Sequence, residues 1–79
     1  MKTAKVSINT IEKVKDFCTK VTCHSDTAID LCSGRYIVDA KSIMGIFSLN
    51  LTEPIELHIH AEDEKAEKIL EELSEYIVD

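Results

Sequence analysis

The chain has 79 residues, with nine Lys and Arg against fifteen Asp and Glu and a net charge of −6. This length predicts one domain, residues 1–79, with a modest core, and the acidic balance argues against direct binding of nucleic acid, which needs basic clusters. No apolar run approaches the roughly 20 residues that span a bilayer, and "MKTAKVSIN" lacks the apolar core of a secretory signal, so we expect a cytoplasmic protein without a membrane partner.

The first half of the chain alternates between strand and helix patterns. "TAKVSI" places every second residue on one apolar face, which predicts a half-buried strand. In "NTIEKVKDFCTKV" the apolar residues recur at helical spacing, which predicts an amphipathic helix with Asn9 as N-cap and Glu12 completing a capping box. "TAIDLCSGRYIVDA" predicts a hairpin of two short strands that turns at Ser33 and Gly34.

The second half predicts two more helices and one more strand. "SIMGIFSL" is too short and too apolar for a free-standing helix, so we expect a brief helix capped by Ser42 and packed on the sheet. After a turn at residues 50–54, "IELHIHA" alternates, with His58 and His60 on its outer face. From Asp63 an amphipathic stripe extends to Ile77. The order βαββαβα predicts an α+β fold, an antiparallel sheet with helices on one face.

The segment "AIDLCSGRYIVDAKSIMGIFSLNLTEPIELHIHA", together with this order of elements, resembles HPr, the small phosphocarrier of the bacterial sugar phosphotransferase system. The signature is Lys41-Ser42-Ile43-Met44-Gly45, followed by Ser48-Leu49. The resemblance implies an open-faced sandwich: a four-stranded antiparallel sheet, with order 1-4-2-3 counted along the chain, covered on one face by three helices.

The resemblance also shows what is missing. HPr carries a Gly-(Leu/Ile)-His-(Ala/Thr)-Arg-Pro-Ala loop between its first strand and first helix, and that histidine accepts phosphate from enzyme I. Here the junction "SINTIEKVKD" contains no His, Arg or Pro, and it is shorter, so Ile11 falls nearest the histidine's place and Lys13 nearest the arginine's. We therefore expect no phosphohistidine near Asn9, Thr10 or Ile11. No nucleophile, base and oxyanion donors converge elsewhere in the sequence, so we also expect no catalytic residue, no cofactor and no enzyme activity.

The regulatory part of the family pattern is retained. In many Gram-positive-type HPr proteins, an HPr kinase phosphorylates the serine of Lys-Ser-Ile-Met-Gly, and the phosphoserine form binds a catabolite control transcription factor. The resemblance implies that Ser42 is a phosphorylation candidate and that a neighbouring patch binds such proteins, or other phosphotransferase components, in sugar transport regulation and catabolite repression. The patch would consist of Lys41, Ile43, Met44 and Phe47. Serine is also a preferred N-cap in its own right, so the alternative is a constitutive interaction or scaffold protein that retains only the HPr fold.

Cysteines and histidines give two further signals. Cys18, Cys23 and Cys32 are an odd number, which argues against a disulfide framework. A surface metal site would draw on the residue types that zinc favours, and the candidates are His58, His60, Asp30 and Cys32. Their spacing matches no zinc motif and alternating histidines usually face solvent, so we predict no metal. Close HPr relatives without the histidine imply either a monomer or a strand-exchanged dimer.

Overall fold

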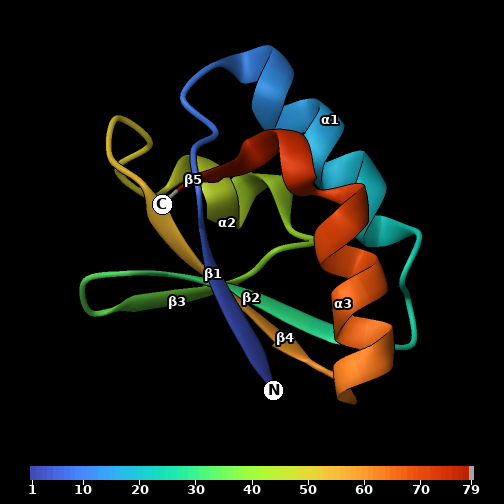
Figure 1. Ribbon diagram of the computed structural model, residues 1–79. Helices are drawn as coiled ribbons and strands as arrows, with labels where there is room; N and C mark the ends of the chain where they lie inside the picture. Colours follow the sequence, from blue (N-terminus) through green and yellow to red (C-terminus); the bar gives the residue numbers. More distant parts are fainter. Residues whose placement is uncertain (79) are drawn as a thin grey trace.

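The computed structural model describes residues 1–78 and contains the predicted order βαββαβα, followed by a 3₁₀ turn and a short fifth strand (Figure 1). The elements are β1 (Lys2–Val6), α1 (Ile11–Thr22), β2 (Ala28–Ser33), β3 (Tyr36–Asp39), α2 (Ile43–Phe47), β4 (Ile55–His60), α3 (Asp63–Glu72), η1 (Ser74–Tyr76) and β5 (Ile77–Val78).

The strands form one antiparallel sheet in the order β3-β2-β4-β1-β5. Its first four members confirm the expected order 1-4-2-3, read from the other edge. The fifth strand corrects the expectation that the final helical stripe reaches Ile77. The helix α3 ends at Glu72, and Ile77 instead pairs with Val6 of β1. Ile77 and Val78 are both β-branched, which suits a strand. Their pairing covers an edge of β1 that would otherwise be free.

The core lies between the sheet and the three helices, which cover the same face (Figure 1). Alternate residues of the strands point into this layer, as the period of two requires. The helices contribute the apolar stripes that their spacing predicts. The buried side chains include Ile29, Leu31, Ile55, Leu57 and Ile59 from the sheet, and Val14, Phe17, Val21, Ala66 and Ile69 from the helices. The opposite face of the sheet carries no helix in residues 1–78, so the expected open-faced sandwich is confirmed.

The start of α1 differs from the expectation by one residue. Thr10, not Asn9, is the N-cap: its backbone is extended, and its Oγ1 accepts a hydrogen bond from the Lys13 N–H at 3.1 Å. Asn9 instead accepts a hydrogen bond from the Lys13 ammonium, with 3.4 Å between the two atoms. Because Lys13 occupies the third helical position, Glu12 cannot complete a capping box.

The hairpin between β2 and β3 turns one residue later than expected: Ser33 is the last residue of β2 and pairs with Tyr36, so the two turn residues are Gly34 and Arg35. Gly34 has a φ of +60°, a conformation that side chains with a Cβ rarely adopt. A glycine at the first of two turn residues is typical of a type II′ turn, whose twist matches that of the strands. The hairpin extends beyond the helices at the β3 edge of the sheet (Figure 1).

Candidate functional site

Ser42 lies at the N-terminus of α2, and its predicted capping role is confirmed. Its backbone is extended, with φ −96° and ψ 104°, and its Oγ accepts a hydrogen bond from the Gly45 N–H at 3.2 Å. The Ser42 carbonyl accepts the first helical hydrogen bond, from the Ile46 N–H at 3.0 Å. The side chain is exposed, so its hydroxyl caps the helix at the surface of the protein.

A network of backbone contacts holds Ser42 in this position. The Asp39 carbonyl accepts a hydrogen bond from the Ser42 N–H at 2.9 Å, and the Asp39 carboxylate accepts one from the Lys41 N–H at 2.9 Å. On the other side, the Cys18 thiol of α1 lies 3.5 Å from the Lys41 carbonyl. The turn before α2 is therefore tied to both β3 and α1, and the position of Ser42 follows from the packing of all three elements.

Gly45 permits the close approach of α2 to the sheet. A Cβ added at this position would lie 3.2 Å from Cβ of Val38 in β3 and 3.3 Å from Oγ of Ser42. Both distances are tighter than ordinary contacts, so a larger residue would push the helix away from β3 or crowd the cap. A glycine inside so apolar a segment was the only sequence signal for this contact.

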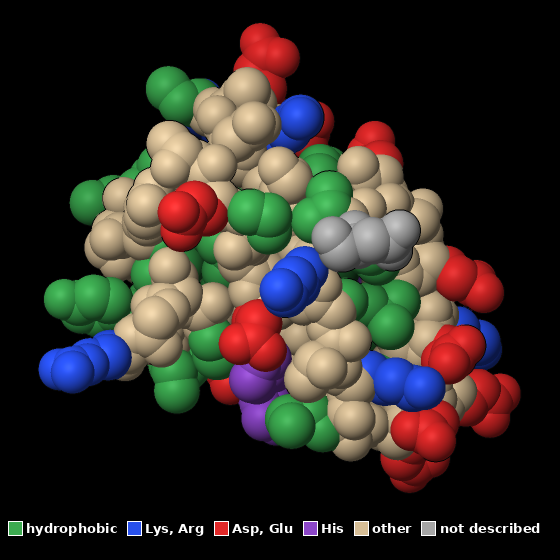
Figure 2. Space-filling model, turned by 60° about the vertical axis from the view of Figure 1, so that its left-hand side comes forward, with side chains coloured by type: hydrophobic (Ala, Val, Ile, Leu, Met, Phe, Trp, Pro, Cys, Tyr) green, Lys and Arg blue, Asp and Glu red, His purple; other side chains and the backbone are tan. Residues whose placement is uncertain are grey.

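The apolar side chains of α2 divide between core and surface. Ile46 is fully buried and Ile43 packs partly against the core, whereas Met44 is 77% exposed and Phe47 is 42% exposed. These two exposed side chains, with the Ser42 hydroxyl, are called the α2 surface below. Figure 2 shows hydrophobic side chains standing out on one side of the molecule, away from the densest group of Asp and Glu side chains.

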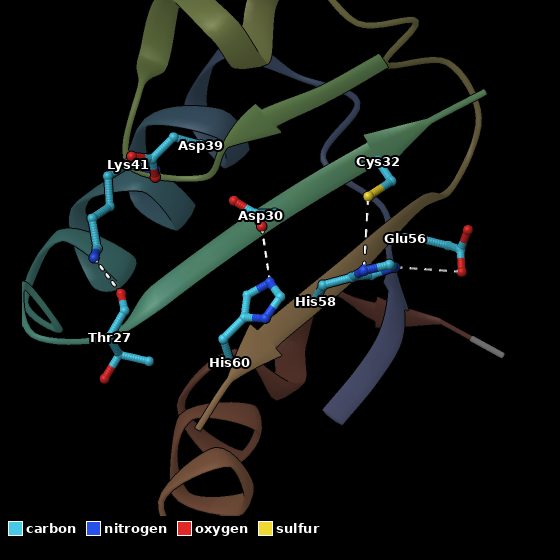
Figure 3. Close-up of polar contacts among 8 residues, drawn as sticks. All are labelled: Thr27, Asp30, Cys32, Asp39, Lys41, Glu56, His58 and His60. Atoms are coloured by element: carbon cyan, nitrogen blue, oxygen red, sulfur yellow. Dashed lines mark hydrogen bonds and ion pairs between the residues drawn. The ribbon is translucent and has the colours of Figure 1, made fainter. Parts of the chain in front are cut away.

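Lys41 differs from the other members of the predicted patch. Its ammonium donates a hydrogen bond to the Thr27 carbonyl, in the loop between α1 and β2 (Figure 3). The side chain is half-buried, and its charge serves to tie that loop to the start of α2. Sequence reasoning missed this contact because the two residues are 14 positions apart.

The junction between β1 and α1 carries no imidazole. It contains Asn9 and Thr10, whose polar groups bind Lys13, and it leads into Ile11, which is 63% exposed. His24 follows the other end of α1 and lies 3.1 Å from Glu72. The two remaining histidines belong to β4, on the face of the sheet without helices. The structure therefore places every histidine away from this junction.

The four metal candidates lie on the open face of the sheet, but they form two separate pairs (Figure 3). His60 Nε2 lies 2.9 Å from Asp30 Oδ2, and the Cys32 sulfur lies 3.8 Å from His58 Nδ1. Residues 1–78 bring together no group of three or more His, Cys, Asp and Glu side chains that could hold a metal ion. The arrangement is therefore one of hydrogen-bonded pairs across β2 and β4.

His58 is more enclosed than its outward position predicts. Its Nε2 is buried and lies 3.7 Å from the Glu56 carboxylate, which is too long for a hydrogen bond. Burial, with the nearby charges of Glu56 and Asp30, raises the pKa of the Cys32 thiol. Cys32 therefore stays protonated at neutral pH in the metal-free protein.

The described part of the chain offers surfaces in place of a cleft. Residues 1–78 contain no pocket, and none of their helices has the length and apolar character that crossing a membrane requires.

Comparison with known proteins identifies the family. The model of the family described as "PTS HPr component phosphorylation site" matches residues 3–79. The chain is similar to the crystal structure of HPr-C-His from Thermoanaerobacter tengcongensis, with 28% identity over 92% of this chain and 90% of that chain and a TM-score of 0.72. It is also similar to the phosphocarrier protein HPr from Bacillus anthracis str. Ames, with 27% identity, coverage of 98% and 94%, and a TM-score of 0.69. Curated proteins gave no match. The chain belongs to the HPr family of phosphocarrier proteins of the phosphotransferase system.

Proposed function

We propose that this chain is a cytoplasmic regulatory binding module of the phosphotransferase system that carries no phosphate on histidine and presents the α2 surface to protein partners. One observation carries the proposal: the exposed Ser42 hydroxyl stands at the start of α2 beside exposed Met44 and Phe47, whereas the β1–α1 junction has no histidine. The partners would be an HPr kinase, a catabolite control transcription factor or other components of the system.

Loss of the phosphocarrier reaction follows from the side chains at the junction. A phosphohistidine needs an imidazole nitrogen, and this segment supplies an amide, a hydroxyl and an alkyl group from Asn9, Thr10 and Ile11. Thr10 also occupies the Lys13 N–H, one of the helix N-terminal donors that would otherwise stabilise a phosphoryl group. The junction thus lacks an imidazole to accept the phosphoryl group, and one of the backbone N–H donors that would stabilise that group is already occupied.

Incubation with enzyme I and phosphoenolpyruvate tests this part of the proposal. An ordinary HPr in the same reaction is the positive control and gains an acid-labile phosphoryl group. We expect this chain to remain unmodified. An acid-labile phosphate on His24, His58 or His60 would show that another histidine has taken over the reaction.

Phosphorylation of Ser42 is compatible with the local geometry. A phosphoserine adds about −1.5 to −2 charges, which a helix N-terminus favours. The Gly45 N–H that now binds Oγ can bind a phosphoryl oxygen instead. The new charge would stand next to Met44, so a partner that recognises both would distinguish the two forms of the protein.

Treatment with an HPr kinase and ATP, followed by mass spectrometry, tests Ser42 directly. Ser48 is a matched control, because it caps the other end of the same helix and its hydroxyl donates to the Gly45 carbonyl at 2.6 Å. We expect one phosphate on the wild type and on Ser48→Ala, and none on Ser42→Ala. An unmodified wild type, under conditions that modify an ordinary HPr, would contradict the proposal.

Binding measurements with a catabolite control transcription factor test the switch. We expect the phosphorylated chain to bind more tightly than the unmodified chain, and Met44→Ala and Phe47→Ala to weaken that binding without loss of fold. Equal binding of the two forms would favour the alternative, a constitutive interaction protein, over the switch.

A further inference from the structure

The strand β3 is an exposed edge of the sheet. No strand among residues 1–78 pairs with its outer side, and the hairpin that carries it extends beyond the helices (Figure 1). Two of its side chains are strongly exposed, Tyr36 at 71% and Ile37 at 70%. Natural edge strands are usually protected by being short, by Lys or Pro, or by a bulge; β3 is short, with four residues, but "YIVD" contains neither Lys nor Pro and pairs with β2 in a continuous register. This edge is therefore open to another strand.

The backbone of β3 presents a defined set of hydrogen-bonding groups outward. The Ala40 N–H donates to the Ile29 carbonyl of β2 at 2.9 Å. Bonded and non-bonded pairs alternate along an antiparallel ladder, so Tyr36 and Val38 also direct their backbone groups toward β2. Within β3 the outward groups are consequently the N–H and C=O of Ile37 and the N–H of Asp39, whose carbonyl already accepts the Ser42 N–H.

The side chains of this segment are complementary to themselves in antiparallel order. We propose that β3 pairs with β3 of a second copy of this chain, with Ile37 opposite Ile37 on the two-fold axis. This register places Arg35 opposite Asp39 of the second copy at both ends, and Tyr36 opposite Val38 of the second copy. Unlike charges and apolar side chains thus meet across the interface, as stable cross-strand pairs require.

The register also agrees with the backbone. Ile37 directs both backbone groups outward and Asp39 its N–H, and the proposed pairing joins Ile37 to Ile37 and Asp39 to Arg35 of the second copy. The two sheets become one continuous sheet, and the exposed Ile37 side chain is covered by its counterpart. This pairing requires neither phosphorylation of Ser42 nor exchange of a strand between copies.

Exchange of the two charges tests the proposal by sedimentation velocity over a wide range of concentrations. We expect the wild type to dimerise reversibly, and Arg35→Glu and Asp39→Lys each to dimerise roughly tenfold more weakly, because each places two like-charge pairs across the interface. An equimolar mixture of the two variants restores opposite charges at both ends. We expect this mixture to recover wild-type affinity as a heterodimer.

Asp39 needs a separate control because its carboxylate also accepts the Lys41 N–H at 2.9 Å. Asp39→Asn keeps an acceptor for this hydrogen bond and removes only the charge. We expect it to weaken dimerisation less than Asp39→Lys does, and circular dichroism checks that every variant is folded. The proposal would be overturned if dimerisation weakened only in variants that lose the hydrogen bond between the Lys41 N–H and residue 39, whatever their charge.

Amide hydrogen exchange, followed residue by residue by NMR, reads the register directly. At high protein concentration we expect new protection of the N–H groups of Arg35, Ile37 and Asp39, with no change at Tyr36 and Val38, which already bond to β2. A wild type that stays monomeric at millimolar concentration would overturn the proposal. A dimer whose affinity is unchanged in both charge variants, and in which these three amides stay unprotected, would also overturn it; a strand-exchanged dimer would behave in this way.

Discussion

The hydroxyl oxygen of Ser42 lies 3.2 Å from the backbone nitrogen of Gly45 and accepts its hydrogen bond. The same Gly45 lies so close to β3 that an added Cβ would crowd both Val38 and the Ser42 hydroxyl. The cap and the packing of α2 on the sheet therefore depend on one another, and substitutions at either residue should reveal this dependence.

Removal of the Ser42 hydroxyl should destabilise the protein modestly. Ser42→Ala leaves the Gly45 N–H without its acceptor, and loss of such a cap costs about 1 kcal/mol. Ser42→Asp should retain most of the stability, because aspartate is an equally good cap. Urea unfolding measures both changes. Ser25→Ala is the control, because Ser25 is exposed and caps no helix of residues 1–78, and a loss there equal to that of Ser42→Ala would show that capping is not the cause.

Substitution of Gly45 by alanine should fail to stabilise α2. Alanine is favoured over glycine in a helix by about 1 kcal/mol, but here its Cβ would lie 3.2 Å from Cβ of Val38. We expect the close contact to cancel this gain and Gly45→Ala to be less stable than the wild type in urea unfolding.

A double-mutant cycle with Val38→Gly isolates that contact, because glycine lacks the Cβ that the added Cβ at position 45 would meet. The double variant should therefore be more stable than the sum of the single changes predicts, by about 0.5 kcal/mol or more. Strict additivity would mean that the cost of Gly45→Ala arises elsewhere.

Local periodicity was sufficient to predict most of the fold. The alternation of "IELHIH" and the helical spacing of Val14, Phe17 and Val21 each define one apolar face, and a single core buries all of these faces together. The last strand could not be predicted this way. Ile77 continues the spacing of the preceding helix, and only its pairing with distant Val6 shows that it belongs to the sheet.

The site was predictable to a similar degree. A serine before an apolar segment predicted the cap, and the number of apolar residues in so short a helix predicted that some would be exposed. The role of the Lys41 ammonium depends on Thr27, and the position of the turn depends on Cys18, 23 residues from Lys41. Such contacts arise from the packing of separate elements, so no local pattern contains them.

The three cysteines should react with a thiol reagent in a fixed order. Cys23 is exposed and should be alkylated first by iodoacetamide. Cys32 is half-buried, and burial together with Glu56 and Asp30 raises the pKa of its thiol, so it should react more slowly at neutral pH. Cys18 is buried, with a pKa also raised by burial and by Asp39, and should react only when the protein opens.

Mass spectrometry of peptides from a time course measures this order. Urea supplies the control, because the three thiols should react at similar rates in the unfolded chain. Reaction of Cys18 before Cys32 in the folded protein would contradict the packing of α1 against the turn that precedes α2.

The ion pair between Lys20 and Glu75 should make stability depend on pH. It joins α1 to η1, and the Lys20 ammonium also lies 5.2 Å from the centre of the Tyr76 ring. The hydrogen bond from Lys20 lowers the pKa of Glu75 below its ordinary 4.5, and the hydrogen bond to Glu75 raises the pKa of Lys20 above its ordinary 10.5. The contribution of Glu75 is therefore complete above pH 4.5 and is lost as the pH falls through its lowered value. The contribution of Lys20 is complete below pH 10.5 and is lost as the pH rises through its raised value.

Thermal unfolding of Glu75→Gln across the acidic range tests the Glu75 half of this pair. We expect the variant to melt below the wild type at neutral pH, and the difference to shrink as the pH falls below 4.5, because protonation removes the same charge from the wild type. Both residues are at the surface, so the difference should be small and should decrease further in high salt. Glu71→Gln is the matched control, since Glu71 is exposed and makes no ion pair within residues 1–78. A difference for Glu75→Gln that is independent of pH, or one that Glu71→Gln reproduces, would contradict a specific link between Lys20 and Glu75.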